Sequence, residues 1–185
     1  MDQSAITVRY AKAFFSLAKE KNLIQPFKND IEFVSEICNT SNEFILLLES
    51  PILKTSKKSE IITSIFEGKI NDLTLKFLQL IVKNKREIYI PAICRNYLAL
   101  TRKDQNIKLA KLTTATAIDQ KTVEKIKVTI ERELNAKVEL TTNVKPDIIG
   151  GLILRMEDKQ FDASVATQLK KIQQELEETE IKQVK

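Results

Sequence analysis

The side chains that could perform chemistry in this chain of 185 residues are carboxylates, lysines, hydroxyls and two cysteines, because the sequence contains no histidine. Nucleophiles activated by histidine, HExxH zinc sites and histidine-ligated iron are therefore excluded. Cys38 and Cys94 stand 56 positions apart without a CxxC motif, each on an apolar helical stripe. We expect both to be buried thiols that pack as small hydrophobic side chains, with a redox or metal role as the less favoured alternative.

Carboxylates near the C-terminus suggest a metal site at first sight. Glu157, Asp158 and Asp162 are close in sequence, but they lack the DxDxDG spacing of a calcium loop. A turn followed by a helix N-cap is the favoured interpretation. The nearby pair Gly150-Gly151 precedes a strand-like run, whereas phosphate-binding glycines open a helix. We therefore predict a positive φ or a close backbone approach at this pair, and no metal or cofactor.

Signals for nucleotide or nucleic-acid binding are weak. With only three glycines, the sequence contains neither GxxxxGK[ST] nor GxGxxG. The net charge of +5 and the pI of about 9.1 invite a nucleic-acid hypothesis. However, residues 1–105 hold 16 basic and 12 acidic groups, and residues 106–185 hold 14 and 13, so no segment is strongly basic. Most of the aromatic residues fall on apolar helical stripes instead of alternating with basic residues, which argues against base stacking.

A membrane-spanning segment and a secretory signal are not expected. The longest run of apolar or glycine residues is Ile148 to Leu154, which is seven residues long. A helix needs about 20 apolar residues to cross a bilayer. The first residues reach Arg9 without an apolar region of the kind that a signal peptide contains.

Residues 1–105 show helical periodicity almost throughout. One segment, for example, places Phe27, Ile31, Val34 and Cys38 on one face. Prolines and one glycine fall between the periodic segments or in first turns. The sequence predicts six helices in this region. The first covers about residues 4–21, the second follows Pro26, and the third is short and covers residues 44–48. The fourth begins at about Thr55 and stops at Gly68, and the last two cover about residues 71–84 and 87–103.

At Asn106 the pattern changes from helical to alternating. We predict strands at 107–116, 138–142 and 152–156, with a short return strand at 160–161. One helix follows Asp119 and ends at Asn135, and a second carries Val165, Leu169, Ile172 and Leu176. The fold class is therefore α+β and mainly α. A six-helix bundle (1–105) is followed by a small α+β domain (106–185) with a short sheet and two helices.

The first and fifth predicted helices are more apolar than a surface helix requires. In each of them apolar residues cover an arc of roughly 220°, although a stripe of ~100° is enough to pack against one core. One interpretation makes these the two central helices of the bundle. The other is a groove between them that accepts an amphipathic helix from a partner.

The chain resembles, over essentially its whole length, the δ subunit of F-type ATP synthases, which is called OSCP in mitochondria. The stretch from Pro146 to Val165 is similar to the C-terminal signature of that family, and Arg9 to Phe14, Ser50-Pro51 and Asn84-Lys85-Arg86 match weaker family positions. Asn106 departs from the pattern, because a glycine often precedes the first strand. The structural positions of the signature are Pro146, Gly150, Gly151, Asp162 and Ser164.

The resemblance implies a non-catalytic stator subunit of the peripheral stalk, which links the α/β catalytic head to the b subunits and so couples rotor turning to proton-driven ATP synthesis. The bundle would bind the N-terminal helix of an α subunit in a groove of the first and fifth helices. The C-terminal domain would contact the C-terminal end of the b subunits. The groove positions so implied are Tyr10, Ala13, Phe14, Leu17, Phe77, Leu80, Ile81 and Asn84.

The resemblance also implies one copy in a hetero-oligomeric complex, without direct insertion into the membrane. We expect this copy at the cytoplasmic face of a bacterial inner membrane, or in an organelle if the chain has been processed. A basic helical nucleic-acid-binding or regulatory protein is the alternative. An enzyme that uses only carboxylates and lysines is less favoured still, because no carboxylate pair stands in a strongly apolar setting.

Overall fold

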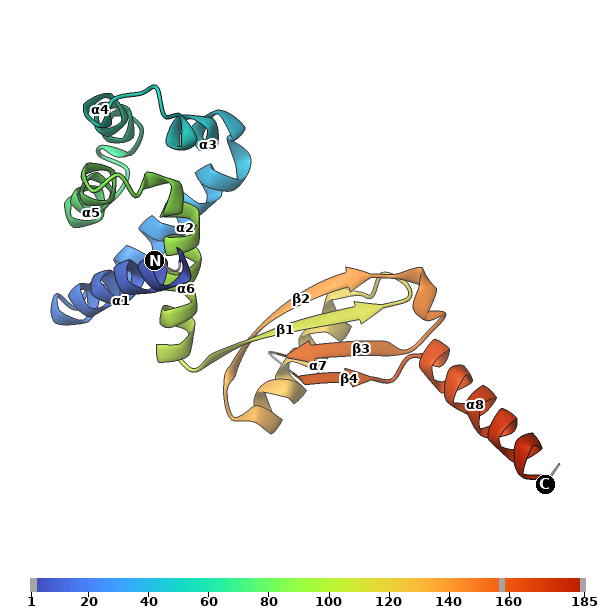
Figure 1. Cartoon of the computed structure of the whole chain (residues 1–185). Helices are drawn as coiled ribbons and strands as arrows, with labels where there is room; N and C mark the ends of the chain where they lie inside the picture. Colours follow the sequence, from blue (N-terminus) through green and yellow to red (C-terminus); the bar gives the residue numbers. More distant parts are fainter. Residues whose placement is uncertain (1–2, 157–158, 184–185) are drawn as a thin grey trace. The chain divides into compact units, whose positions relative to one another are not determined.

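The computed structural model describes residues 3–156 and 159–183 (Figure 1). The chain divides into two compact units, of which the first ends at Gln105 and the second begins at Asn106. Each unit has its own hydrophobic core and is described separately.

The N-terminal unit is helical. Among its described residues there are six α-helices, as predicted, and the fifth and sixth are joined by a short 3-10 turn, η1. Pro26 lies in the first turn of the second helix, where its missing N–H costs no helical hydrogen bond, and the helix begins two residues earlier, at Ile24. The elements are α1 (Gln3–Glu20), α2 (Ile24–Thr40), α3 (Asn42–Glu49), α4 (Thr55–Phe66), α5 (Asp72–Lys83), η1 (Glu87–Tyr89) and α6 (Ile90–Asp104).

Local chemistry explains where α4 and α5 begin and end. Gly68 follows α4 with a φ of +73°, a conformation that glycine adopts without steric cost. The side chain of Asn71 caps α5 by accepting a hydrogen bond of 2.9 Å from the N–H of Leu73. Lys85 ends the same helix in a left-handed conformation, and its N–H donates to the carbonyl of Val82 at 2.9 Å.

An aromatic stack forms the centre of the bundle. The ring of Phe14 on α1 lies nearly parallel to Phe27 on α2 and to Phe77 on α5, with centroid distances of 4.7 and 4.1 Å. Tyr97 on α6 packs against the same ring at 5.3 Å. Four helices therefore meet at one side chain, and burial of the surrounding apolar residues supplies most of the stabilisation.

The C-terminal unit is a four-stranded sheet with two helices, which confirms the predicted α+β, mainly α, fold class. The strand order is β2-β1-β3-β4. Strands β1 and β2 are parallel and joined by α7, whereas β3 pairs antiparallel with β1 and with β4. The elements are β1 (Ile107–Thr114), α7 (Gln120–Leu134), β2 (Lys137–Val144), a 3-10 turn η2 (Pro146–Ile148), β3 (Leu152–Met156), β4 (Lys159–Asp162) and α8 (Val165–Gln183).

Helix α7 covers one face of this sheet. Its Ile130 is buried against Ala110 of β1 and Val138 of β2. Asn135 ends the helix with a φ of +47°, as expected for an asparagine at a helix end. The predicted first strand is two residues too long, because pairing with β2 and β3 stops at Thr114. Of the predicted turn between the last two strands, Glu157 and Asp158 lie outside the described residues.

In the part of the chain that the structure describes, no helix combines the length and the apolar character that crossing a membrane requires.

A buried ion pair ties together three elements of the bundle. The Nζ of Lys58 on α4 lies 2.7 Å from Oε1 of Glu87 on η1 and donates a second hydrogen bond of 2.8 Å to the carbonyl of Leu48 on α3. Both charged side chains are buried. The second oxygen of Glu87 is also buried and has no hydrogen-bond partner among the described residues. Removing one charge would leave the other buried and unpaired.

We therefore expect Lys58→Met to lower the free energy of unfolding of the bundle by about 3 to 5 kcal/mol. The double variant Lys58→Met/Glu87→Leu should lose much less, because no buried charge remains. The three tyrosines, Tyr10, Tyr89 and Tyr97, all lie in this unit, so tyrosine fluorescence during urea unfolding reports on the bundle alone. Equal losses in the single and double variants would contradict this account.

Candidate partner-binding site

A strip of partly exposed, mainly apolar side chains runs along α1 and α5, which come together at Tyr10, Phe77 and Asn84. The rings of Tyr10 and Phe77 are 6.4 Å apart, and the amide of Asn84 donates a hydrogen bond of 3.2 Å to the hydroxyl of Tyr10. We call this strip the seam and define it by Tyr10, Ala13, Leu17, Phe77, Leu80 and Asn84.

The predicted groove positions divide into two groups. Leu80 is 49% exposed, Ala13 and Asn84 are exposed, and Tyr10, Leu17 and Phe77 are partly exposed. By contrast, Phe14 is only 2% exposed and Ile81 is fully buried. These two residues lie beneath the seam and support it, because they pack into the core of the chain itself. A docking helix could contact only the exposed group.

A surface depression continues the seam on the other side of α5. Leu80 belongs to both, and the two lysines that stand one turn before and one turn after it, Lys76 and Lys83, lie on its rim. Sequence periodicity could not reveal the contribution of α4, because its packing against α5 is a long-range contact. The lining residues are Thr55, Ser56, Ser59, Lys76, Gln79, Leu80 and Lys83.

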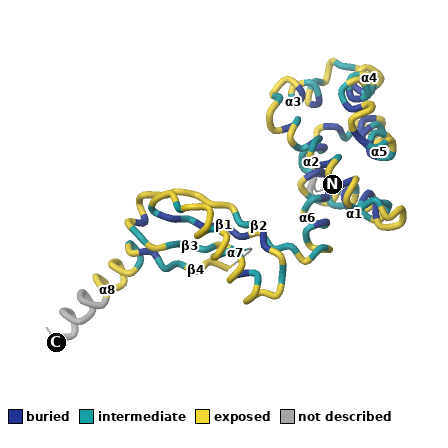
Figure 2. Tube along the Cα trace, turned by 180° about the vertical axis from the view of Figure 1, so that it is seen from behind, coloured by how far each residue is buried: buried dark blue, intermediate teal, exposed yellow. Residues whose placement is uncertain are grey.

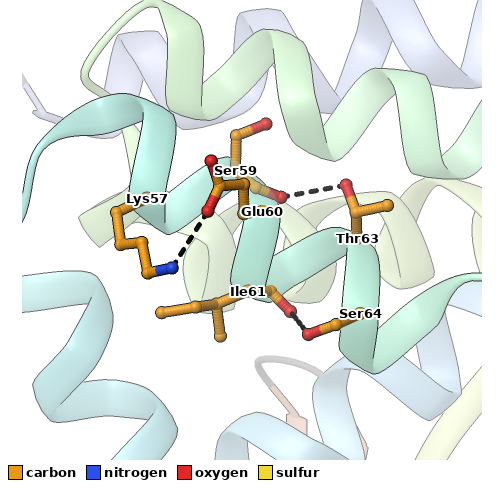
Figure 3. Close-up of polar contacts among 6 residues, drawn as sticks. All are labelled: Lys57, Ser59, Glu60, Ile61, Thr63 and Ser64. Atoms are coloured by element: carbon orange, nitrogen blue, oxygen red, sulfur yellow. Dashed lines mark hydrogen bonds and ion pairs between the residues drawn. The ribbon is translucent and has the colours of Figure 1, made fainter.

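A chain of hydrogen bonds holds α4 against α5 beside this depression. The side-chain amide of Gln79 donates to the hydroxyl of Thr63 at 2.9 Å, and that hydroxyl donates to the carbonyl of Ser59 at 2.9 Å. Figure 3 shows the second bond, together with the similar bond from Ser64 to the carbonyl of Ile61. The wall formed by α4 is therefore fixed relative to α5.

The C-terminal signature residues form the junction between η2, β3 and α8. Pro146, which is exposed, opens η2. Gly151 has a φ of +76°, and a Cβ at this position would lie 2.2 Å from the carbonyl oxygen of Ala163. Gly150 has no positive φ, and its carbonyl accepts a hydrogen bond of 3.0 Å from the N–H of Val165. The prediction of a positive φ and a close backbone approach is confirmed at Gly151.

Ser164 and Asp162 build the start of α8. The hydroxyl of Ser164 accepts a hydrogen bond of 3.3 Å from the N–H of Thr167, so Ser164 is the N-cap. Asp162 lies two residues earlier and accepts from the N–H of Ser164 and the hydroxyl of Thr167. Hydrogen bonds from Ser164, and more weakly from Thr167, lower the pKa of the Asp162 carboxyl. The lowered pKa stabilises the junction at neutral pH, and this contribution is lost as the pH falls through that pKa.

Ile149 is a strained and exposed residue in the same junction. Its φ of +67° and ψ of −46° belong to a γ-turn, which the N–H of Gly150 closes on the carbonyl of Ile148 at 2.7 Å. A β-branched residue rarely adopts a positive φ, and such strain costs on the order of 1 to 3 kcal/mol. The side chain is nevertheless 64% exposed.

The chemistry available in the described residues is limited. No group of three or more cysteine, aspartate or glutamate side chains there could hold a metal ion. Cys38 and Cys94 are buried, as predicted, and burial raises the pKa of the Cys38 thiol to about 11 and raises that of Cys94 as well. Both thiols stay protonated at neutral pH and are poor nucleophiles.

Comparisons with known proteins match the chain over most of its length. The family model described as ATP synthase delta (OSCP) subunit matches residues 6–176. ATP synthase subunit delta of Bacteroides fragilis is 34% identical over 177 residues, which cover 95% of each chain. The protein of the same name from Thermosynechococcus vestitus is 35% identical and covers 88% of this chain and 89% of its own. A chain in the cryo-EM structure of the Toxoplasma gondii mitochondrial ATP synthase hexamer superposes with a TM-score of 0.73 at 26% identity, covering 92% of this chain and 96% of that one.

The two glycines of the junction should differ in their tolerance of alanine. We expect Gly151→Ala to destabilise the C-terminal unit by more than about 1 to 3 kcal/mol, which is the cost of the positive φ alone. The close contact of the new Cβ with the carbonyl oxygen of Ala163 would add to this cost. Gly150→Ala should cost less, because its Cβ would meet only the side chain of Val165, at 3.2 Å. Hydrogen exchange of the β1 and β3 amides measures both effects, and equal effects would contradict this assignment.

Proposed function

The chain belongs to the ATP synthase delta (OSCP) family. We propose that its two units bind two different partners in the stator of an F-type ATP synthase. Proteins of this family are non-catalytic subunits of that complex, so the chain is a stator component and not an enzyme. The nucleic-acid alternative is set aside, because the family match covers most of the chain. The partner contacts below are our proposal.

The N-terminal unit is proposed to bind the N-terminal helix of an α subunit along the seam. The observation that carries this proposal is the exposure of Leu80 beside Tyr10, Leu17 and Phe77, whose side chains pack against the core but remain partly exposed. An amphipathic helix would bury these side chains through anchors at i, i+3, i+4 and i+7. Fully burying a leucine or phenylalanine side chain contributes about 1.5 to 3 kcal/mol, so a few anchors give a moderate affinity.

The C-terminal unit is proposed to contact the C-terminal end of the b subunits through α8. Val165, Leu169 and Ile172 follow each other at i, i+4 and i+7, so they lie on one face of the helix. All three are exposed, and Figure 2 shows the described part of α8 as largely exposed. The exposed Ile149 precedes Gly150, whose carbonyl is bonded to the N–H of Val165, and so adds an apolar group near the start of this stripe.

These two contacts together would connect the α/β head to the b subunits and prevent the head from turning with the rotor. Rotor movement would then be coupled to proton-driven ATP synthesis. On this proposal one copy of the chain sits peripherally at the cytoplasmic face of a bacterial inner membrane, or at the equivalent organellar surface, and is held there by protein contacts alone.

Leu80→Asp should weaken binding of an N-terminal α-subunit peptide to the full chain at least tenfold, about 1.4 kcal/mol, because it places a charge on an apolar anchor. Leu46→Asp is the matched control, since Leu46 is slightly more exposed than Leu80 (59% against 49%) in the same unit but lies on α3. Titration calorimetry measures the affinity, and tyrosine fluorescence verifies that both variants are folded. An unchanged affinity for Leu80→Asp would refute the seam as the binding site.

Leu169→Asp should likewise reduce the capture of a C-terminal b-subunit fragment by the full chain, about tenfold, by breaking the stripe on α8. Val128→Asp on α7 is the control, because Val128 is an exposed apolar residue of the same unit outside that stripe. Equal capture by wild type and Leu169→Asp would move the b-subunit contact away from α8.

A further inference from the structure

Two lysines of α5, Lys76 and Lys83, stand beside the seam. Lys76 and Lys83 are both exposed, and neither forms an ion pair within the described part of the chain. They are seven residues apart, so they lie on the same side of the helix at a separation of about 10.5 Å. Leu80, the most exposed large apolar residue of α5, lies between them.

The charge pattern of α4 differs from that of α5. Its exposed Lys57 is paired with Glu60 at 3.0 Å, as Figure 3 shows. A second depression on α4 shares Ser56 and Ser59 with the first but carries Glu60 and Glu67 on its lining. The depression beside Leu80 is therefore lined by two lysines, whereas the second depression is lined by two glutamates, of which Glu60 is paired with Lys57.

We propose that the helix docking on the seam carries two acidic side chains, two turns apart, on the flank that faces Lys76 and Lys83. This inference rests on the function proposed above and specifies the chemistry of the α-subunit segment that binds there. An acidic flank would complement the two lysines and could accept hydrogen bonds from the hydroxyls of Thr55, Ser56 and Ser59. A basic flank would meet uncompensated like charges, so the same lysines select against it.

The spacing also restricts how the helix lies. Two carboxylates seven residues apart match two lysines seven residues apart only if the two helices run nearly parallel or antiparallel, with a crossing angle near 20°. At a steeper crossing only one of the two pairs could form. The lysines therefore contribute orientation as well as affinity, while the apolar seam supplies most of the contact.

The test compares Lys76→Glu/Lys83→Glu with the wild type in titrations of the full chain with the N-terminal α-subunit peptide. We expect affinity to fall about fivefold to thirtyfold at low ionic strength, as two exposed pairs are lost and reversed. The difference in affinity between the wild type and the lysine variant should become smaller at high ionic strength, because salt screens exposed charges. Lys121→Glu/Lys125→Glu on α7 is the control, with the same change in net charge on a helix of the other unit.

A second peptide makes the result specific. This second peptide has lysine in place of the acidic residues of the proposed flank. We expect it to bind the variant Lys76→Glu/Lys83→Glu more tightly than it binds the wild type. The inference is overturned if Lys76→Glu/Lys83→Glu binds the native peptide as tightly as the wild type does, or if the native peptide has no acidic residue on that flank. If Leu80→Asp abolishes binding while the lysine variant does not, the seam remains the docking site and only the acidic flank is rejected.

Discussion

The packing of Phe14 is the interaction on which the N-terminal unit depends. One ring on α1 contacts rings from α2, α5 and α6, so the positions of four helices are fixed at a single point. Ring pairs of this kind contribute about 0.5 to 1.5 kcal/mol each beyond the area that they bury. Since Phe77 belongs both to this stack and to the seam, the seam is positioned directly by a buried ring of the core.

The stacking of Phe77 on Phe14 explains how the partly exposed side chains of the seam can be well ordered in the isolated chain. Surface apolar groups that move freely lose conformational entropy when a partner binds, and the lost entropy weakens the complex. Here the strip is ordered beforehand, because the Phe77 ring stacks on Phe14 and the Tyr10 hydroxyl is held by Asn84. Lys58 and Glu87 add a second constraint by joining α3 and α4 to the turn that follows α5. The unit thus presents a surface that needs little rearrangement.

The sequence predicted the architecture well, because helical and alternating periodicity are local properties. It identified the helical first unit, the change of pattern at Asn106 and the conformational role of Gly151. It could not tell which part of a wide apolar arc would be covered by neighbouring helices, and so Phe14 and Ile81 stood beside Leu80 among the expected contact residues. The same limit hid the pairing of Lys58 with Glu87, which joins segments that periodicity does not relate. The positive φ of Ile149 was missed for another reason, because a β-branched residue rarely adopts it.

A stator connection must resist a turning force. Two attachments of moderate affinity can meet this requirement, because joining them makes the whole attachment stronger than either one alone. On the proposed assignment each surface is a single apolar stripe, and association costs an estimated 4 to 15 kcal/mol of free energy before any stripe contributes. Once one unit is bound, the other is confined near its own partner. The effective concentration that results can strengthen the whole attachment about 10² to 10⁴-fold without any new contact. Each contact can therefore form separately during assembly, while the complete attachment is stronger than either contact alone.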